Sequence, residues 1–113
     1  MISRTVRRAD LLRYAAASGD DNPIHQDPAA ARAAGLPDVV AHGMFVLGLA
    51  MRAVAEWTGD TVTDYRARFV RPVVVPAEGT VIDISGRRDD DEISVTVRCH
   101  DEVVTTVTVL VRP

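Results

Sequence analysis

The stretch from Met44 to Trp57 restricts the possible folds of this chain more than any other. Only Arg52 and Glu56 are charged within it, and apolar residues fall on nearly every face of a helix drawn through it. A helix that is apolar all round is a buried one, and we expect Gly48 at its middle to mark a close contact with another element. Its residues would rise roughly 21 Å, short of the ~30 Å hydrocarbon core of a bilayer, so the stretch predicts a buried central helix and not a membrane span.

After Gly59 the pattern changes to the two-residue alternation of β-strands. We expect strands at residues 63–69, 79–87, 93–99 and 103–111, with a short edge strand at residues 2–6. Short connections predict an antiparallel sheet, and one buried helix against it predicts an α+β fold in which the sheet wraps around the helix. A chain of 113 residues can bury one core, so we expect one domain over residues 1–113.

Two shorter helices are expected before the central one. The first covers residues 9–17 and ends at Gly19, which suits a left-handed cap. The second starts at Asp27 and Pro28, with the aspartate as N-cap, and ends at Gly35. Asp27 is therefore expected to be structural.

Composition and charge exclude several function classes. The net charge is -3 and the pI is near 5.5, which argues against nucleic acid as a partner because no basic stripe can neutralise phosphates. All the basic side chains are Arg, so a lysine Schiff base is not available. The single Cys99 allows no internal disulfide and no cysteine-based zinc site, which fits a cytoplasmic protein.

Residues 18–27 form a polar stretch that cannot be buried as core. Asn22 and Pro23 predict a turn that folds the stretch back on itself. Asp20 and His25 could then approach one water molecule from two sides, as general acid–base catalysis requires. The alternative is an ordinary surface turn with a solvated histidine.

Gly43 lies at the start of the expected central helix. It has no side chain to block the free amides of the first turn, which suit a carbonyl oxygen or an oxyanion. The neighbouring His42 is expected to support the site by hydrogen bonding rather than to act directly. His100 is expected to be a solvated residue of the last hairpin turn.

These residues resemble a known family. The run from Tyr14 to Asp27 (YAAASGDDNPIHQD), the run from Ala41 to Met44 (AHGM) and the segment from residue 65 to residue 76 are similar to the hydratase motif and following strand of the MaoC-like dehydratases and (R)-specific enoyl-CoA hydratases, which have the hot-dog fold. Within the family, the chain resembles the dyad-bearing subunit of the mycobacterial (3R)-hydroxyacyl-carrier-protein dehydratase.

The resemblance implies a catalytic dyad of Asp20 and His25, a Gly43 amide that polarises the thioester carbonyl, and an Asn22 that orders the loop. The expected reaction is hydration of a trans-2-enoyl thioester or dehydration of a (3R)-hydroxyacyl thioester, with the acyl group on coenzyme A or acyl carrier protein. It requires no metal or redox cofactor. The family's assembly implies a homodimer, or a heterodimer with a related hot-dog subunit.

Two departures from the family pattern concern the first helix. Many members carry additional residues before it, so part of the substrate tunnel or dimer edge is expected either to be missing or to be supplied by a partner. The usual Ser or Thr cap is replaced by Arg7 or Arg8. The resemblance also makes Arg66, Arg68 and Arg71 candidates for contact with phosphates or with an acidic carrier protein, although exposed strand arginines are normally only solvated.

Three alternatives remain open at this point. His25 and Asp27 with the distal His42 match the composition of a two-histidine, one-carboxylate iron site, which would indicate an oxygenase. A non-catalytic subunit that shapes an acyl tunnel for a partner is the second. A thioesterase on the same fold is the third.

Overall fold

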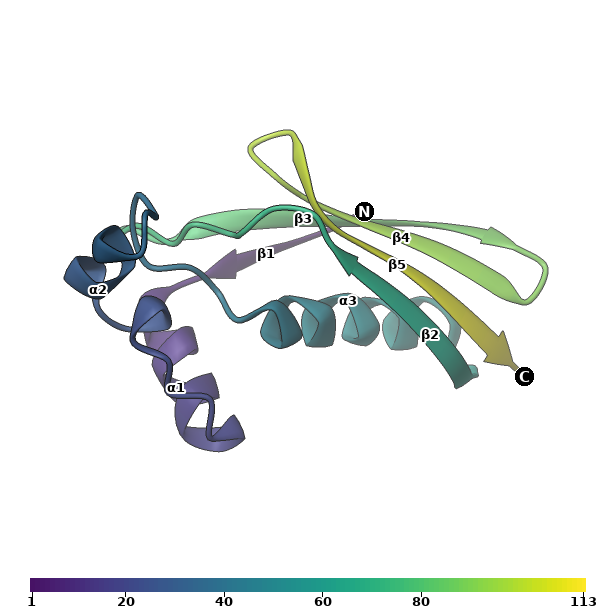
Figure 1. The fold of residues 1–113 in the computed structure, drawn as a ribbon. Coiled ribbons are helices and arrows are strands. Elements are labelled where there is room, and N and C mark those ends of the chain that lie inside the picture. Colours follow the sequence, from purple (N-terminus) through teal and green to yellow (C-terminus); the bar gives the residue numbers. More distant parts are fainter.

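The computed structural model describes all residues from 1 to 113. Its sheet lies on one side of the long helix α3, and the shorter helices gather at one end of the molecule (Figure 1). In chain order the elements are β1 (Ile2–Val6), α1 (Arg8–Ser18), the 3₁₀ turn η1 (Pro23–His25), α2 (Pro28–Ala33), α3 (Gly43–Thr58), β2 (Thr61–Phe69), β3 (Thr80–Asp89), β4 (Glu92–Cys99) and β5 (Glu102–Arg112).

The five strands form one sheet in the order β1-β3-β4-β5-β2, and every neighbouring pair is antiparallel. The antiparallel sheet predicted from the sequence is therefore confirmed. β1 and β2 are the two edges, so the first strand of the chain and the strand after α3 lie at opposite sides of the sheet. A register shift between Val62 and Asp64 interrupts the pairing of β2 with β5.

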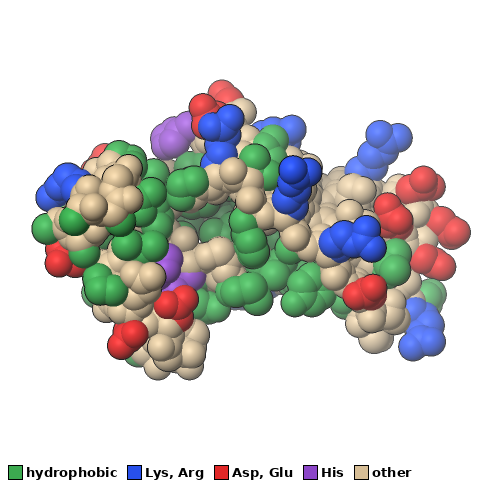
Figure 2. Space-filling view, viewed as in Figure 1, with side chains coloured by type: hydrophobic (Ala, Val, Ile, Leu, Met, Phe, Trp, Pro, Cys, Tyr) green, Lys and Arg blue, Asp and Glu red, His purple; other side chains and the backbone are tan.

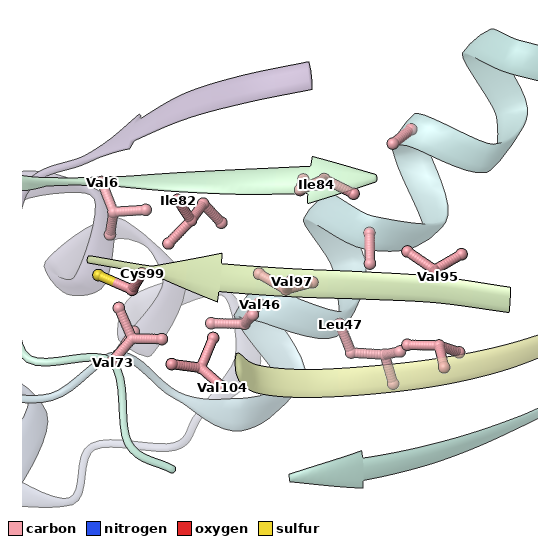
Figure 3. Packing of buried hydrophobic residues seen from close by; sticks show 14 of the residues in the cluster. Val6, Val46, Leu47, Val73, Ile82, Ile84, Val95, Val97, Cys99 and Val104 are labelled. Carbon is pink, nitrogen blue, oxygen red and sulfur yellow. The ribbon is translucent and has the colours of Figure 1, made fainter. Parts of the chain in front are cut away.

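The core lies between the sheet and one face of α3. Alternate residues of the central strands point to the helix, among them Ile82 and Ile84 of β3 and Val95 and Val97 of β4, all of them fully or almost fully buried. Figure 3 shows these side chains meeting Val46 and Leu47 of the helix. The α+β architecture of a sheet curved around a central helix is confirmed.

The helix is less enclosed than its apolar composition suggested. Met44 is 53% exposed, and a Cβ added at Gly48 would have no atom within 4 Å. The expectation that α3 is covered on every side and that another element packs against Gly48 is wrong for this chain. The physical reason is that the sheet covers only one face of α3, and no second layer covers the other (Figure 1).

The predicted helix ends are confirmed by their backbone. Gly19 and Gly59 adopt left-handed conformations with φ of 80° and 67°, and each amide bonds to the helix that it closes. Asp27 caps α2 by accepting a hydrogen bond from the Ala29 amide at 3.0 Å. Arg7 occupies the N-cap of α1, where the family usually has Ser or Thr.

No helix of the chain is both long and apolar enough to cross a membrane.

Candidate active site

The polar loop between α1 and α2 is ordered by its own side chains. Asn22 caps η1, where its side-chain oxygen accepts a hydrogen bond from the Ile24 amide at 3.2 Å. The Asp20 carboxylate accepts a longer one, 3.4 Å, from the Asn22 amide. The Gln26 side chain donates to the Asp21 carbonyl at 3.0 Å. Pro23 starts the 3₁₀ turn, as the Asn-Pro pair predicted, and the loop bends so that Asp20 and His25 lie on the same side.

The connector before α3 holds the histidine of this loop. Val40 donates its amide to the Ile24 carbonyl at 3.1 Å, and its own carbonyl lies 2.6 Å from His25 Nδ1. Because a carbonyl oxygen can only accept, His25 must carry its proton on Nδ1. In the neutral ring this leaves Nε2 unprotonated and able to accept a proton, which is the state that a general base needs.

His42 is buried directly behind His25. Only 2% of its surface is exposed, and the two imidazole rings stack with centroids 3.8 Å apart and planes inclined by 22°. The Tyr14 ring also packs against His42, with ring centroids 4.7 Å apart and planes inclined by 60°. His42 Nε2 donates to the Asp20 carbonyl at 3.0 Å, whereas Nδ1 is buried without a partner. The residue therefore links the loop to the N-terminus of α3, for which it is the N-cap.

One polar group from each of Asp20, His25 and His42 lies within 4.8 Å of the other two. In Figure 2, imidazole surface is visible beside carboxylate surface on the side of the molecule where α1 lies, next to a broad apolar area. The sequence pattern predicted the approach of Asp20 to His25. The approach of His42 to both depends on the tertiary fold.

The same three groups have the composition of a metal site, but their geometry does not suit one. A metal bound to two imidazoles lies in the plane of each ring at ~2.0–2.1 Å from nitrogen. The two rings are stacked, with centroids 3.8 Å apart and planes inclined by only 22°, so one ion cannot lie in both ring planes at that distance. Asp27, the carboxylate of the alternative iron site, is occupied as the cap of α2. The oxygenase alternative is therefore not supported.

Gly43 is the first residue of α3, so the helix leaves its amide without a partner inside the helix. A cavity of about 370 Å³ lies beside it, walled by α3 and by the chain that follows β2. A Cβ added at Gly43 would lie 3.1 Å from the Phe69 ring, so only glycine leaves this space free. Asp20 and His25 do not line the cavity. His42 does not line it either, although it directly precedes Gly43 in the chain.

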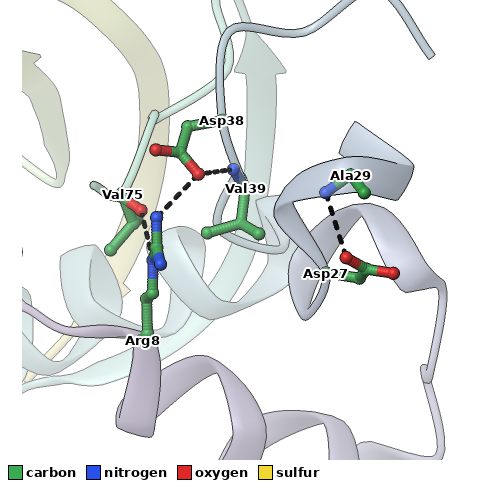
Figure 4. Close-up of polar contacts among 6 residues, drawn as sticks. All are labelled: Arg8, Asp27, Ala29, Asp38, Val39 and Val75. Carbon is green, nitrogen blue, oxygen red and sulfur yellow. Dashed lines mark hydrogen bonds and ion pairs between the residues drawn. The ribbon is translucent and has the colours of Figure 1, made fainter. Parts of the chain in front are cut away.

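The elements around the site are held together by hydrogen bonds that the sequence did not predict. Arg8 at the start of α1 donates to the Asp38 carboxylate at 2.7 Å and to the Val75 carbonyl at 3.2 Å, and Asp38 accepts from the Val39 amide (Figure 4). These bonds tie α1, the connector and the segment before β3 together. The roles of Arg8, Asp38 and the Val40 carbonyl were missed because each depends on residues far away in the sequence.

The other residues that the sequence singled out, three arginines and His100, do not lie together in one site. Of the three arginines proposed for phosphate contact, Arg71 lines the cavity beside Gly43, whereas Arg66 lines a separate hollow near Leu110. Arg68 lines none of the hollows described here. His100 lies in the last turn and is exposed, as predicted, but its Nε2 also lies 3.4 Å from the hydroxyl of the buried Thr80.

The chain has an antiparallel sheet on a central helix, with a carboxylate and two imidazoles close together near the helix N-terminus, which is the arrangement expected of a hot-dog dehydratase or hydratase. Residues 1–107 match the MaoC-like domain family. The chain belongs to this family.

Named relatives agree with the assignment. The 3-hydroxyacyl-thioester dehydratase X of Mycobacterium tuberculosis is 45% identical over 69 residues, which are 61% of this chain and 24% of that protein. Its crystal structure superposes with a TM-score of 0.84 at 33% identity, covering 96% of this chain and 46% of that one. A solved MaoC-like dehydratase gives a TM-score of 0.88 at 35% identity, with 98% and 38% covered. The chain thus spans less than half the length of these relatives.

The fold also occurs at lower identity. The ChsH1-ChsH2 complex of Mycobacterium tuberculosis matches with a TM-score of 0.85 at 21% identity, covering 97% of this chain and 90% of the matched chain.

Proposed function

We propose that this chain catalyses the reversible hydration of trans-2-enoyl thioesters, which in reverse is the dehydration of (3R)-hydroxyacyl thioesters, with the acyl group on coenzyme A or acyl carrier protein. The observation that carries the proposal is the approach of the Asp20 carboxylate and the His25 ring beside the free amide end of α3. The names of the relatives, a 3-hydroxyacyl-thioester dehydratase and a MaoC-like dehydratase, support the same chemistry.

In the hydration direction, Asp20 and His25 hold one water molecule. His25 Nε2 takes a proton from it, because Nδ1 is already committed to the Val40 carbonyl. Asp20 accepts the second water proton as a hydrogen bond and directs the oxygen toward C3 of the enoyl group. A carboxylate and a neutral imidazole can share this task because both are acceptors at neutral pH.

Attack at C3 moves negative charge onto the thioester oxygen. The Gly43 amide and the positive end of the α3 dipole stabilise this enolate, an effect worth a few kcal/mol when the donor is preorganised. The proton that His25 took from the water then passes to C2, which returns the imidazole to its neutral form, so that the net change is the addition of water. The scheme uses no change of redox state and assigns no step to a metal or cofactor.

We further propose that the chain works as a homodimer or as a heterodimer with a related hot-dog subunit. The edge strand β2 supports this, because its large apolar side chains remain exposed and nothing pairs with its outer edge. Asp20 and His25 are intact in this chain, which argues against a purely non-catalytic subunit.

The test follows the loss of enoyl-thioester absorbance with crotonyl-CoA and longer analogues. We expect Asp20→Asn to fold normally, because the side chain is exposed, and to lose roughly 10²- to 10⁴-fold in kcat/KM. Asp21→Asn is the matched control, since it removes the adjacent charge from the same loop and should retain activity. Equal loss in both variants, or full activity in Asp20→Asn, would contradict the proposal. Release of free thiol from an acyl-CoA would indicate a thioesterase instead.

A further inference from the structure

Three polar side chains are buried in this chain, and one of them has no hydrogen-bond partner. His42 bonds to the polar loop, and the Thr80 hydroxyl lies 3.3 Å from Cys99 Sγ. The third, Thr105 of β5, is only 2% exposed and makes no side-chain hydrogen bond. A hydroxyl that is withdrawn from water without a partner costs free energy, so its presence at a buried position needs a physical reason.

An irregularity of the sheet sets the direction of Thr105. The register between β4 and β5 shifts between Val97 and Arg98. Opposite this shift the alternation of β5 is interrupted, and the consecutive residues Val104 and Thr105 are both buried. A bulge of this kind changes the face to which a side chain points, and bulges are frequent beside functional sites. Thr105 therefore lies on the core side of the sheet, whereas strict alternation after Val104 would place it outside.

Thr105 lines the cavity of about 370 Å³ beside Gly43, which we call the Gly43 cavity. His42 Nδ1 is the only completely enclosed polar side-chain atom without a partner, so the Thr105 hydroxyl keeps some free surface, and the side chain meets open space in this cavity. Arg71 also lines it, but its side chain is 60% exposed and pairs with a carboxylate. The remaining side chains of the wall are apolar: Ala41, Val46, Phe69, Val70, Pro72 and Val73.

Thr105 and Gly43 can contact the same ligand, since they line one cavity from opposite elements, β5 and α3. Phe69 lies next to both. It is the cross-strand partner of Thr105, and its ring lies 3.1 Å from the position of a Cβ at Gly43. An acyl group whose thioester oxygen is bound by the Gly43 amide can therefore pass the Phe69 ring and meet the Thr105 hydroxyl.

We propose that Thr105 makes this chain selective for acyl groups that carry an uncharged oxygen, as an ether, keto or hydroxyl group, beyond the reacting carbons. The proposal rests on the thioester chemistry proposed above and names its substrate class. A threonine hydroxyl donates one hydrogen bond and accepts others, so it can pair with each of these oxygens. A plain alkyl chain leaves the hydroxyl unpaired and is bound less well. Thr105 takes no part in the addition of water.

The test compares trans-2-decenoyl-CoA with analogues in which one methylene, at C6, C7 or C8, is replaced by an ether oxygen. We expect at least one analogue to show a kcat/KM about 3- to 10-fold above that of the alkyl substrate, mainly through KM, because it gains one hydrogen bond. Thr105→Val keeps the shape of the side chain without the hydroxyl, so it should abolish this preference without lowering the melting temperature. Thr105→Ser keeps the hydroxyl and should keep the preference.

Thr106→Val is the matched control. Thr106 follows Thr105 on β5 and pairs with Thr96 and Arg68 on the outer face of the sheet, so this variant should behave like the wild type. Equal kcat/KM for the alkyl substrate and all the ether analogues in the wild type would overturn the proposal. So would a preference that survives in Thr105→Val, or one that Thr106→Val abolishes equally.

A failure of the proposed reaction can be told apart from a failure of this proposal. If the wild type hydrates none of these substrates, the proposed reaction fails. Calorimetric titration with decanoyl-CoA and its ether analogues, which cannot be hydrated, then decides the role of Thr105. Tighter binding of one ether analogue that Thr105→Val abolishes supports the proposal, and equal affinities contradict it.

Discussion

His42 is the residue that joins the polar loop, with its proposed dyad of Asp20 and His25, to the central helix. Its Nε2–H bond to the Asp20 carbonyl contributes about 0.5–1.5 kcal/mol to stability, while its unpartnered, buried Nδ1 costs about 1–3 kcal/mol. His42→Phe keeps a ring stacked on His25 and removes both nitrogens. We therefore expect little change in melting temperature together with a 10- to 100-fold lower kcat, because the dyad loses its positioning bond.

The measurement pairs thermal unfolding with kinetics on the same preparation. His42→Ala is the comparison, since it also removes the ring that fills the space between Tyr14 and His25, and it should lose stability as well as activity. If His42→Phe kept full kcat, the bond to Asp20 would have no part in positioning.

At this scale the sequence revealed local interactions and missed distant ones. The Asp27 cap, the Asn22 turn and the left-handed Gly19 could be predicted because each depends on its immediate neighbours. The hydrogen bond from His25 to the Val40 carbonyl could not be predicted. Every residue has a backbone carbonyl, so the sequence does not indicate which one bonds to His25, and Val40 is 15 residues away.

Where α3 ends, its last turn packs against the sheet at a glycine. A Cβ added at Gly86 of β3 would lie 2.5 Å from the Trp57 ring, closer than real Cβ contacts allow. We expect Gly86→Ala to displace the indole and to destabilise the fold by about 1–3 kcal/mol, as overpacking does. Trp57 is the only tryptophan, so its emission spectrum should shift in the native state and the urea midpoint should fall.

Gly48→Ala is the control within the same helix. Its added methyl meets no atom within 4 Å, so helix propensity should raise stability by up to ~1 kcal/mol without a shift of the Trp57 emission. A Gly86→Ala protein as stable as the wild type would show that the tryptophan moves at no cost. The different surroundings of these two glycines were not readable from the sequence, because hydropathy indicates that a helix has apolar faces but not which of them another layer covers.

On the scale of the whole molecule, only part of the strand order could be predicted from the sequence. Alternation and turn residues predicted β3, β4 and β5 as consecutive antiparallel neighbours, because short turns join them. The pairing of β1 with β3 joins segments on opposite sides of α3 in the sequence, and the pairing of β2 with β5 joins strands that the β3–β4 hairpin separates, so both depend on how the sheet closes over the helix.

This strand order leaves β2 as an edge with an apolar surface. Tyr65 and Phe69 pair with Val109 and Thr105, whose side chains are buried, yet the two rings are 48% and 51% exposed. An uncovered edge strand with exposed apolar side chains favours pairing with another sheet. We expect Tyr65→Lys to convert the proposed dimer to a monomer in light scattering coupled to size exclusion, because the charge would be buried at the interface.

Leu110→Lys provides the matched control. Leu110 is 39% exposed on the neighbouring strand β5, and its side chain points to the opposite face from the buried Val109 and Val111, so a charge there should leave the assembly intact. Because the Gly43 cavity is partly walled by the chain that follows β2, loss of the partner should also raise KM for the enoyl thioester. A wild-type chain that is monomeric and fully active at micromolar concentration would contradict both the interface and its connection to the cavity.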